Sequence, residues 1–170
     1  MGGTVQKPIP VHRVHPATLW GAAFAALLLQ AFLPLVMPMA RVVDLPLLVT
    51  IYFALLRRNK VFGIGLGTGL GVLQDALSHG YIGIHGMTKA LVGYLAGSAS
   101  VRFDLESLGP RSVLTGIFVL LHSLFLLALE HLLLETPHSF QPLDLASGIL
   151  VNVALGLILF QMLDRLRQPA

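Results

Sequence analysis

Two ionisable side chains stand out because each lies deep in apolar sequence. Asp75 follows the run VFGIGLGTGLGVLQ, and Lys89 lies within IHGMTKALVGYLAG. If these runs lie in a bilayer, each charge costs on the order of 3 kcal/mol or more, so such residues usually face a bundle interior and find a partner. A tight turn around residues 79–83 would bring the two to similar depth on antiparallel helices. We therefore predict that Asp75 and Lys89 form an intramembrane polar pair.

The alternative is that the same two residues are accommodated separately. Lys89 would then extend its ammonium group to the outer interface, while Asp75 would accept backbone or hydroxyl hydrogen bonds nearby. A role in a proton or ion pathway is less expected, because a relay normally needs more than one intramembrane carboxylate.

The remaining candidates for chemistry are histidines, which lack the companions that a catalytic or metal site requires. His122 lies alone in an apolar run, and Glu130 with His131 lies near the end of that run. His79 and His85 flank the turn without the carboxylate or cysteine set of a metal site. The chain has no cysteine, no H-E-x-x-H motif and no Ser–His–Asp order. We therefore predict no catalytic residue, no metal site and no cofactor.

Composition places the chain in a membrane. Of its 170 residues, 55% are hydrophobic and 11% are charged, whereas soluble domains are typically about 25% charged. Lys, Arg, Asp and Glu are absent from Val14–Ala40, Ser112–Leu129 and Leu145–Leu163. Such runs are long enough to cross a hydrocarbon core of about 30 Å. The basic residues are scattered over short connections rather than gathered in a stripe, so a nucleic-acid partner is not expected.

The apolar sequence divides into six segments: Ala17–Met37, Val43–Leu56, Val61–Ser78, Ile84–Ser100, Ser112–Leu134 and Leu145–Leu163. Helices are expected, because lipid offers no partner to backbone groups. Asp44 before Leu-Pro is typical of a helix cap followed by an early proline. The sequence thus predicts an all-α, polytopic bundle of about six transmembrane helices. It divides into a polar leader (1–16), one transmembrane domain (17–166) and a short tail (167–170).

Basic residues in the connections predict the orientation. Nine fall on one side: Lys7, Arg13, Arg57, Arg58, Lys60, Arg102, Arg111, Arg165 and Arg167. Arg41 alone falls on the other side. The asymmetry predicts that both termini are cytoplasmic.

Small residues recur at helical spacing in two segments. In the third segment they form two adjacent stripes, Gly63, Gly67 and Gly71 on one and Gly65 and Gly69 on the other. Such spacing lets helix backbones approach closely in a membrane; a phosphate-binding loop would need a preceding strand and a following Lys-Ser/Thr. A milder version in the first segment pairs Gly21 with Ala25 and Ala22 with Ala26. That face is predicted to dock a helix, either inside the bundle or on a partner protein.

The run from Asp44 to Gly97 resembles a known family. It reads DLPLLVTIYFALL, then GxxxGxxxGVLQDALS, then GYIGIHGMTKALVGYLAG, and it is similar to the bacterial rod shape-determining protein MreD. The resemblance implies a non-catalytic scaffold, in the bacterial inner membrane, of the complex that elongates the lateral cell wall. The partners it implies are a single-span MreC-like protein, the actin-like MreB, the glycosyltransferase RodA and its class B penicillin-binding partner.

The same six-helix arrangement resembles the substrate-binding components of energy-coupling factor transporters. That second likeness implies an alternative function, uptake of a vitamin. The outer connections are short, however, and hold few polar or aromatic residues to enclose such a ligand. Co-purification with an MreC-like chain or with a transporter ATPase module would separate the two functions.

Overall fold

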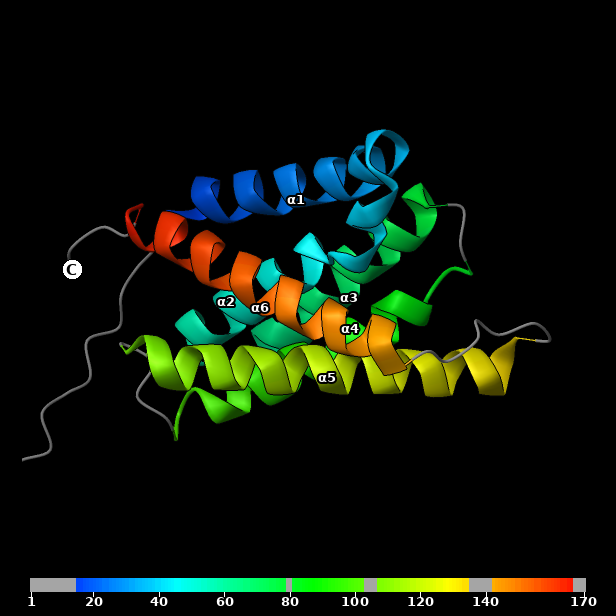
Figure 1. Ribbon diagram of the computed structural model, residues 1–170. Helices are drawn as coiled ribbons and strands as arrows, with labels where there is room; N and C mark the ends of the chain where they lie inside the picture. The colour runs from blue at the N-terminus through cyan, green and yellow to red at the C-terminus, as the bar shows by residue number, and fades with distance from the viewer. Residues whose placement is uncertain (1–14, 79–80, 103–106, 135–141, 167–170) are drawn as a thin grey trace, which may run out of the picture.

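The computed structural model describes residues 15–78, 81–102, 107–134 and 142–166, and this part of the chain is helical throughout (Figure 1). Its elements are α1 (Pro16–Val36), the 3-10 helix η1 (Pro38–Val42), α2 (Leu45–Arg57), α3 (Lys60–Leu77), α4 (Ile84–Ala99), α5 (Leu108–Leu133) and α6 (Pro142–Asp164). The prediction of an all-α bundle is confirmed. The leader up to residue 14 and the tail from residue 167 lie outside the described residues.

Polar caps set where the inner helices begin. Asp44 Oδ1 accepts a hydrogen bond from Leu47 N at 3.0 Å, and Pro46 occupies the first turn of α2, so the predicted cap is confirmed. The Asn59 side chain caps α3 by accepting from the first backbone N–H groups of that helix. Between them Arg58 has a φ of 51°, and this left-handed residue ends α2 and reverses the chain.

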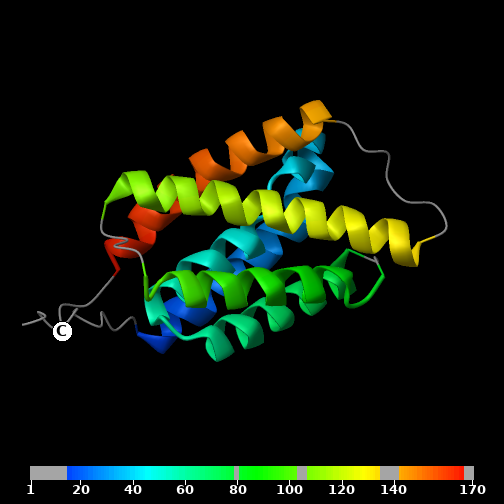
Figure 2. The ribbon, with the colours of Figure 1, turned by 90° about the horizontal axis from the view of Figure 1, so that it is seen from below.

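The short helix α2 is the centre of the bundle. It contacts each of the other five α-helices, and every residue from Pro46 to Leu55 is buried. Figure 1 shows α6 crossing α2 between α1 and α5, and Figure 2 shows α3 and α4 running side by side as an antiparallel pair. A 13-residue helix is about 20 Å long, and its surroundings are protein on all sides.

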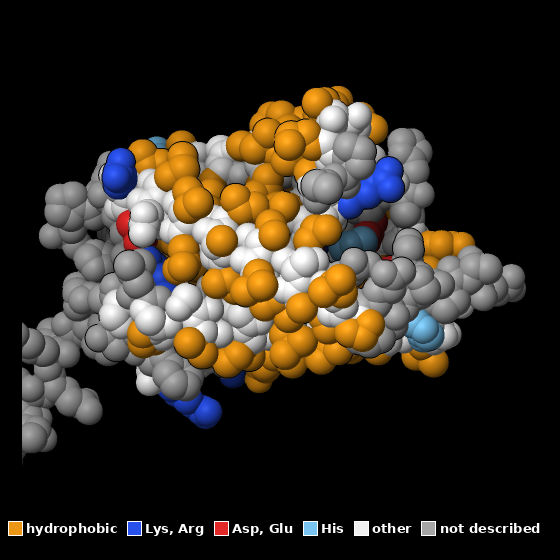
Figure 3. Space-filling model, in the orientation of Figure 1, with side chains coloured by type: hydrophobic (Ala, Val, Ile, Leu, Met, Phe, Trp, Pro, Cys, Tyr) orange, Lys and Arg blue, Asp and Glu red, His pale blue; other side chains and the backbone are white. Residues whose placement is uncertain are grey.

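The outer helices carry the apolar surface that a membrane requires. In the part of the chain that the structure describes, three helices are long and apolar enough to cross a bilayer: Pro16–Val36, Gly109–Leu133 and Leu145–Asp164. Figure 3 shows a mostly apolar surface with charged side chains towards the two ends of the helices. This is a helical membrane protein, in which α2, α3 and α4 are shorter than the outer spans.

The two ends of the bundle differ in charge. The end formed by the α2–α3 connection, the end of α4 and the end of α6 carries Arg57, Arg58, Lys60, Arg102 and Arg165, and is termed the basic end. The opposite end is formed by η1, the start of α2 and the α3–α4 turn, and is termed the η1 end (Figure 1). Arg41 lies at this η1 end.

One glycine stripe brings the backbones of α3 and α4 together. A Cβ atom built on Gly63, Gly67 or Gly71 would lie 2.1, 2.2 or 2.3 Å from the carbonyl oxygens of Gly93, Lys89 and His85, respectively. These atoms belong to the α4 backbone, so a side chain on α3 could be accommodated only by separating the helices. The second stripe differs, because a Cβ on Gly65 or Gly69 would meet nothing within 4 Å.

We predict that Gly67→Ala destabilises the protein although alanine favours a helix. Each added methyl group must push α4 away, and overpacking typically costs about 1–3 kcal/mol. The matched controls are Gly65→Ala and Gly69→Ala, which should be neutral or stabilising by up to about 1 kcal/mol. Thermal unfolding in detergent would measure all three variants. Equal behaviour of Gly67→Ala and Gly69→Ala would contradict the packing argument.

Candidate functional site

A largely buried ion pair lies at the η1 end of the bundle. Lys89 on α4 is 0% exposed, and its Nζ donates to Asp44 Oδ2 at 2.6 Å. The partners lie on different helices, since Asp44 caps α2. Each neutralises a charge that would otherwise be uncompensated in an apolar interior, and breaking such a pair is costly.

Two amide side chains hold the Asp44 segment in place. Asn152 on α6 accepts from Asp44 N at 2.8 Å and donates to Val42 O at 2.7 Å. Gln30 on α1 donates to Val43 O at 2.9 Å and accepts from Leu45 N at 3.0 Å. The backbone between η1 and α2 is therefore tied to both α1 and α6.

Asp75 serves a different element, the start of α4. Its Oδ2 accepts from Gly83 N at 2.8 Å and from His85 N at 3.2 Å, and its Oδ1 lies 2.6 Å from His85 Nδ1. Asp75 is 1% exposed. Because the carboxylate takes the N–H groups that begin α4, it caps that helix from α3.

The predicted direct pair of Asp75 with Lys89 is therefore wrong: each has another partner. Gly67 of α3 faces Lys89 and Gly71 faces His85, so the level of Lys89 on α3 is residue 67. The backbone of Asp75 lies eight residues further along α3, an offset of about 12 Å along the helix axis at about 1.5 Å per residue. The alternative prediction is confirmed for Asp75, which accepts hydrogen bonds from nearby backbone N–H groups. It is wrong for Lys89, which is fully buried and does not extend to an interface.

Thr88 and His122 link the Asp44–Lys89 ion pair to the Asp75–His85 contact in one network. The Thr88 hydroxyl donates to His85 O at 3.0 Å and lies 3.2 Å from His122 Nε2. His122 Nε2 lies 3.7 Å from Asp44 Oδ2, and the rings of His85 and His122 are 6.3 Å apart. His122 is thus a buried hydrogen-bonding residue between α4, α5 and the Asp44 cap. No group of three or more His, Asp or Glu side chains able to hold a metal ion occurs among the described residues.

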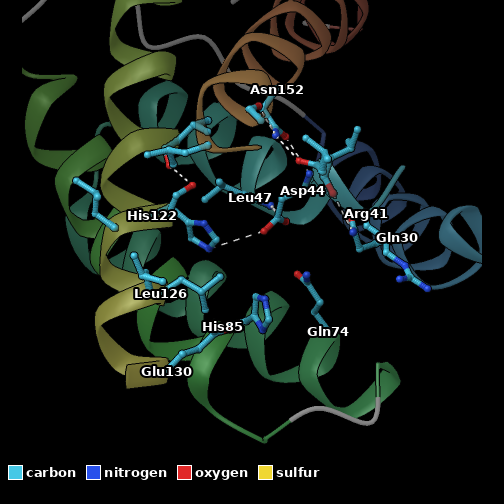
Figure 4. A pocket seen from close by; sticks show the side chains of 18 residues that line it. Gln30, Arg41, Asp44, Leu47, Gln74, His85, His122, Leu126, Glu130 and Asn152 are labelled. Atoms are coloured by element: carbon cyan, nitrogen blue, oxygen red, sulfur yellow. Dashed lines mark hydrogen bonds and ion pairs between the residues drawn. The ribbon is translucent and has the colours of Figure 1, made fainter. Parts of the chain in front are cut away.

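A chamber of about 420 Å³ adjoins this network. Figure 4 shows Asp44, Gln74, His85 and His122 around the same space. Apolar residues of α2, α5 and α6 complete the lining, with Arg41 and Glu130 also contributing. The chamber combines mainly apolar walls with a few convergent polar groups, as ligand pockets do.

A second hollow, of about 760 Å³, lies between α1 and α6 and is termed the α1–α6 groove. Its lining from α1 includes all four small residues noted in the sequence: Gly21, Ala22, Ala25 and Ala26. Leu159, Met162 and Leu163 of α6 line the other side, and Leu45 and Val49 of α2 lie between. No Cα atom of α1 comes within 8 Å of one of α6 along their described lengths, and a Cβ on Gly21 would meet nothing within 4 Å.

The basic end has a partly buried ion pair of its own, which the sequence did not indicate. Arg111 on α5 donates through both guanidinium nitrogens to the Asp164 carboxylate on α6. Tyr52 on α2 also donates to Asp164, at 2.9 Å. The three helices α2, α5 and α6 are therefore joined by polar contacts at this end.

The family model of the rod shape-determining protein MreD matches residues 13–166. The match covers the Asp44 cap, the glycine stripe, the buried network and both hollows. This chain belongs to the MreD family. No curated protein and no solved structure matches it. The resemblance found in the segment from Asp44 to Gly97 is thereby confirmed, and with it a role in determining rod cell shape.

Several residues of the buried network were missed or misassigned from sequence. Asp44 was identified as a cap but not as the partner of Lys89. Gln30 and Asn152 were not singled out, although Gln30 is the one amide of its charge-free apolar segment and Asn152 shares its segment only with Gln161. Polar side chains are expensive in such segments and usually bond across helices, so their presence alone could have marked them.

We predict that Asp44 and Lys89 behave as one coupled unit. Asp44→Asn keeps a good helix cap but strands the ammonium group, and Lys89→Met strands the carboxylate. Each should cost about 3–5 kcal/mol of stability, while the double variant recovers part of the loss. The control cycle combines Asp75→Asn with Lys89→Met and should show nearly additive losses. Thermal unfolding in detergent would measure both cycles, and coupling only in the control cycle would contradict the assignment.

Proposed function

We propose that the chain is a non-catalytic scaffold of the complex that elongates the lateral cell wall. The family match supports a role in rod shape determination. The proposed partners are those the resemblance implies: an MreC-like single-span protein, a wall-elongation glycosyltransferase with its penicillin-binding protein, and actin-like MreB. In this role the protein makes no covalent bonds and acts by holding partner helices in a defined arrangement.

The observation that carries this proposal is the α1–α6 groove. Helices α1 and α6, whose Cα atoms stay more than 8 Å apart, leave a mainly apolar channel between them, and its α1 wall includes Gly21, Ala22, Ala25 and Ala26. Gly21 and Ala25 are exposed there. Small residues allow a foreign helix to come close enough for extensive van der Waals contact, which drives helix association in lipid. The occupant we propose is the transmembrane helix of the single-span partner.

The groove is suited to such a partner because its surroundings are already rigid. Its floor is α2, which is held by the Asp44 network at one end and by the Tyr52–Asp164 contact at the other. A partner helix would therefore meet a preformed surface, which lowers the ordering cost of binding. The bundle would act as a fixed template for the complex.

The orientation that fits this role places the basic end in the cytoplasm, where actin-like filaments lie. Nine basic residues on that side against Arg41 on the other support it. The membrane would be the bacterial inner membrane, with both termini cytoplasmic.

We predict that filling the α1–α6 groove separates partner binding from folding. Gly21→Leu and Ala25→Leu should each lower the amount of co-purified MreC-like partner about tenfold, because steric overlap costs about 1–3 kcal/mol. Thermal stability of the isolated protein should be unchanged, since nothing lies within 4 Å of a Cβ on Gly21. Gly69→Leu, an equally open glycine on another face, is the matched control. If Gly21→Leu and Ala25→Leu co-purify as much MreC-like partner as the unchanged protein does, the proposed docking face is wrong.

We predict a simple readout for the orientation. A reporter that is active only outside the cytoplasm should be inactive when fused at Ala170 and active when inserted at His138, because the positive-inside rule places the basic end in the cytoplasm. Expression levels of the fusions, measured by immunoblot, serve as the control. The reverse activity pattern would reject the orientation.

A further inference from the structure

One buried polar atom is left without a partner by the network around the chamber. Gln74 is 8% exposed, and within the described part of the chain its Oε1 accepts no hydrogen bond. A buried acceptor without a donor is unfavourable, and such atoms are rare in folded proteins. Gln74 lines the chamber and extends into it (Figure 4). An occupant that donates a hydrogen bond would satisfy this atom.

The two aspartates near Gln74 differ in what they leave for an occupant. Asp75 accepts two backbone N–H groups through Oδ2, and its Oδ1 lies 2.6 Å from His85 Nδ1, so this carboxylate is already engaged. The Asp44 carboxylate, already bonded to Lys89, has further acceptor capacity and is partly exposed to the chamber. Gln74 Oε1 and the Asp44 carboxylate therefore favour a ligand that donates hydrogen bonds.

His122 adds no free donor to this wall. The single hydroxyl proton of Thr88 goes to His85 O, so the contact between Thr88 Oγ1 and His122 Nε2 must use the proton of His122. Its Nε2–H is thus engaged. Gln74 Oε1 and the Asp44 carboxylate therefore remain as acceptors for an occupant, beside two groups that can donate, the Gln74 amide nitrogen and the exposed Arg41.

The local charge favours a cation among donor-rich ligands. Asp44 and Glu130 line the chamber, and Asp75 lies directly behind His85. Lys89 is already bonded to Asp44, and Arg41 is exposed. We propose that the chamber binds a primary ammonium group, which has three N–H donors and no acceptor. The group would be carried by an aminophospholipid headgroup or by a free amine.

A comparison of three phospholipids with the same acyl chains tests this chemistry. The delipidated full chain in detergent would receive phosphatidylethanolamine, phosphatidylcholine or phosphatidylglycerol, with binding followed by native mass spectrometry and thermal shift. Phosphatidylcholine keeps the charges but has no N–H donor, so it should bind at least tenfold more weakly than phosphatidylethanolamine. Equal binding of these two, or tighter binding of the hydroxyl-bearing phosphatidylglycerol, would overturn the proposal.

Two variants of Gln74 locate the interaction in the chamber. Gln74→Glu keeps an acceptor of the same size and should retain or tighten phosphatidylethanolamine binding, whereas Gln74→Leu should weaken it about tenfold or more. Gln161→Leu, which removes an exposed glutamine of α6, should leave binding unchanged. Loss of binding in Gln74→Glu together with full binding in Gln74→Leu would overturn the proposal. If Gln74→Leu does not fold, Gln74→Glu and the lipid comparison decide.

Free ethanolamine distinguishes the two sources of the ammonium group. A thermal shift with millimolar ethanolamine that is lost in Gln74→Leu would show that the amine alone is recognised. A response to phosphatidylethanolamine without one to ethanolamine would assign the site to the lipid headgroup. The absence of both responses would overturn the proposal.

Discussion

The contact between the Lys89 ammonium group and the Asp44 carboxylate constrains most of this structure. A charge buried among apolar helices must be neutralised where it lies, so α4 must present Lys89 at the level of the α2 cap. That placement in turn depends on Gly67, because only a residue without a Cβ lets the Lys89 backbone approach α3 so closely. Asn152 and Gln30 then fix the Asp44 backbone from α6 and α1. The close packing of α3 on α4 and the neutralisation of the buried charge therefore depend on the same few residues.

Small residues serve two separate purposes in this chain. Inside the bundle, Gly63, Gly67 and Gly71 bring α3 into backbone contact with α4. On the outside, Gly21 and Ala25 lie on a face that no other described helix covers. The first arrangement makes the protein rigid, and the second leaves room for a partner. The proposed scaffold needs both, since an adaptable template would not fix the geometry of a complex.

The sequence was sufficient for the membrane class, the six helices, the Asp44 cap and the family, because each depends on local pattern. The pairing of the charged side chains could not be predicted from local pattern. Asp44 and Lys89 are far apart in the chain, and their contact depends on the α3–α4 register. That register is set by where the connection folds back beside α3, and an error of two turns was enough to suggest Asp75 instead. The chamber was also missed, since it is bounded by residues from all seven helical elements of the described chain.

The enclosure of α2 has a consequence for how the protein is made. A 13-residue helix with ten consecutive buried residues has almost no surface for lipid to solvate, and it is too short to cross the hydrocarbon alone. It therefore cannot be a stable intermediate when it leaves the ribosome. We expect α2 to become stable only when the helices that enclose it are inserted as well, so that it passes from the insertion machinery into protein. The shortest α-helix thus couples its own insertion to that of its neighbours.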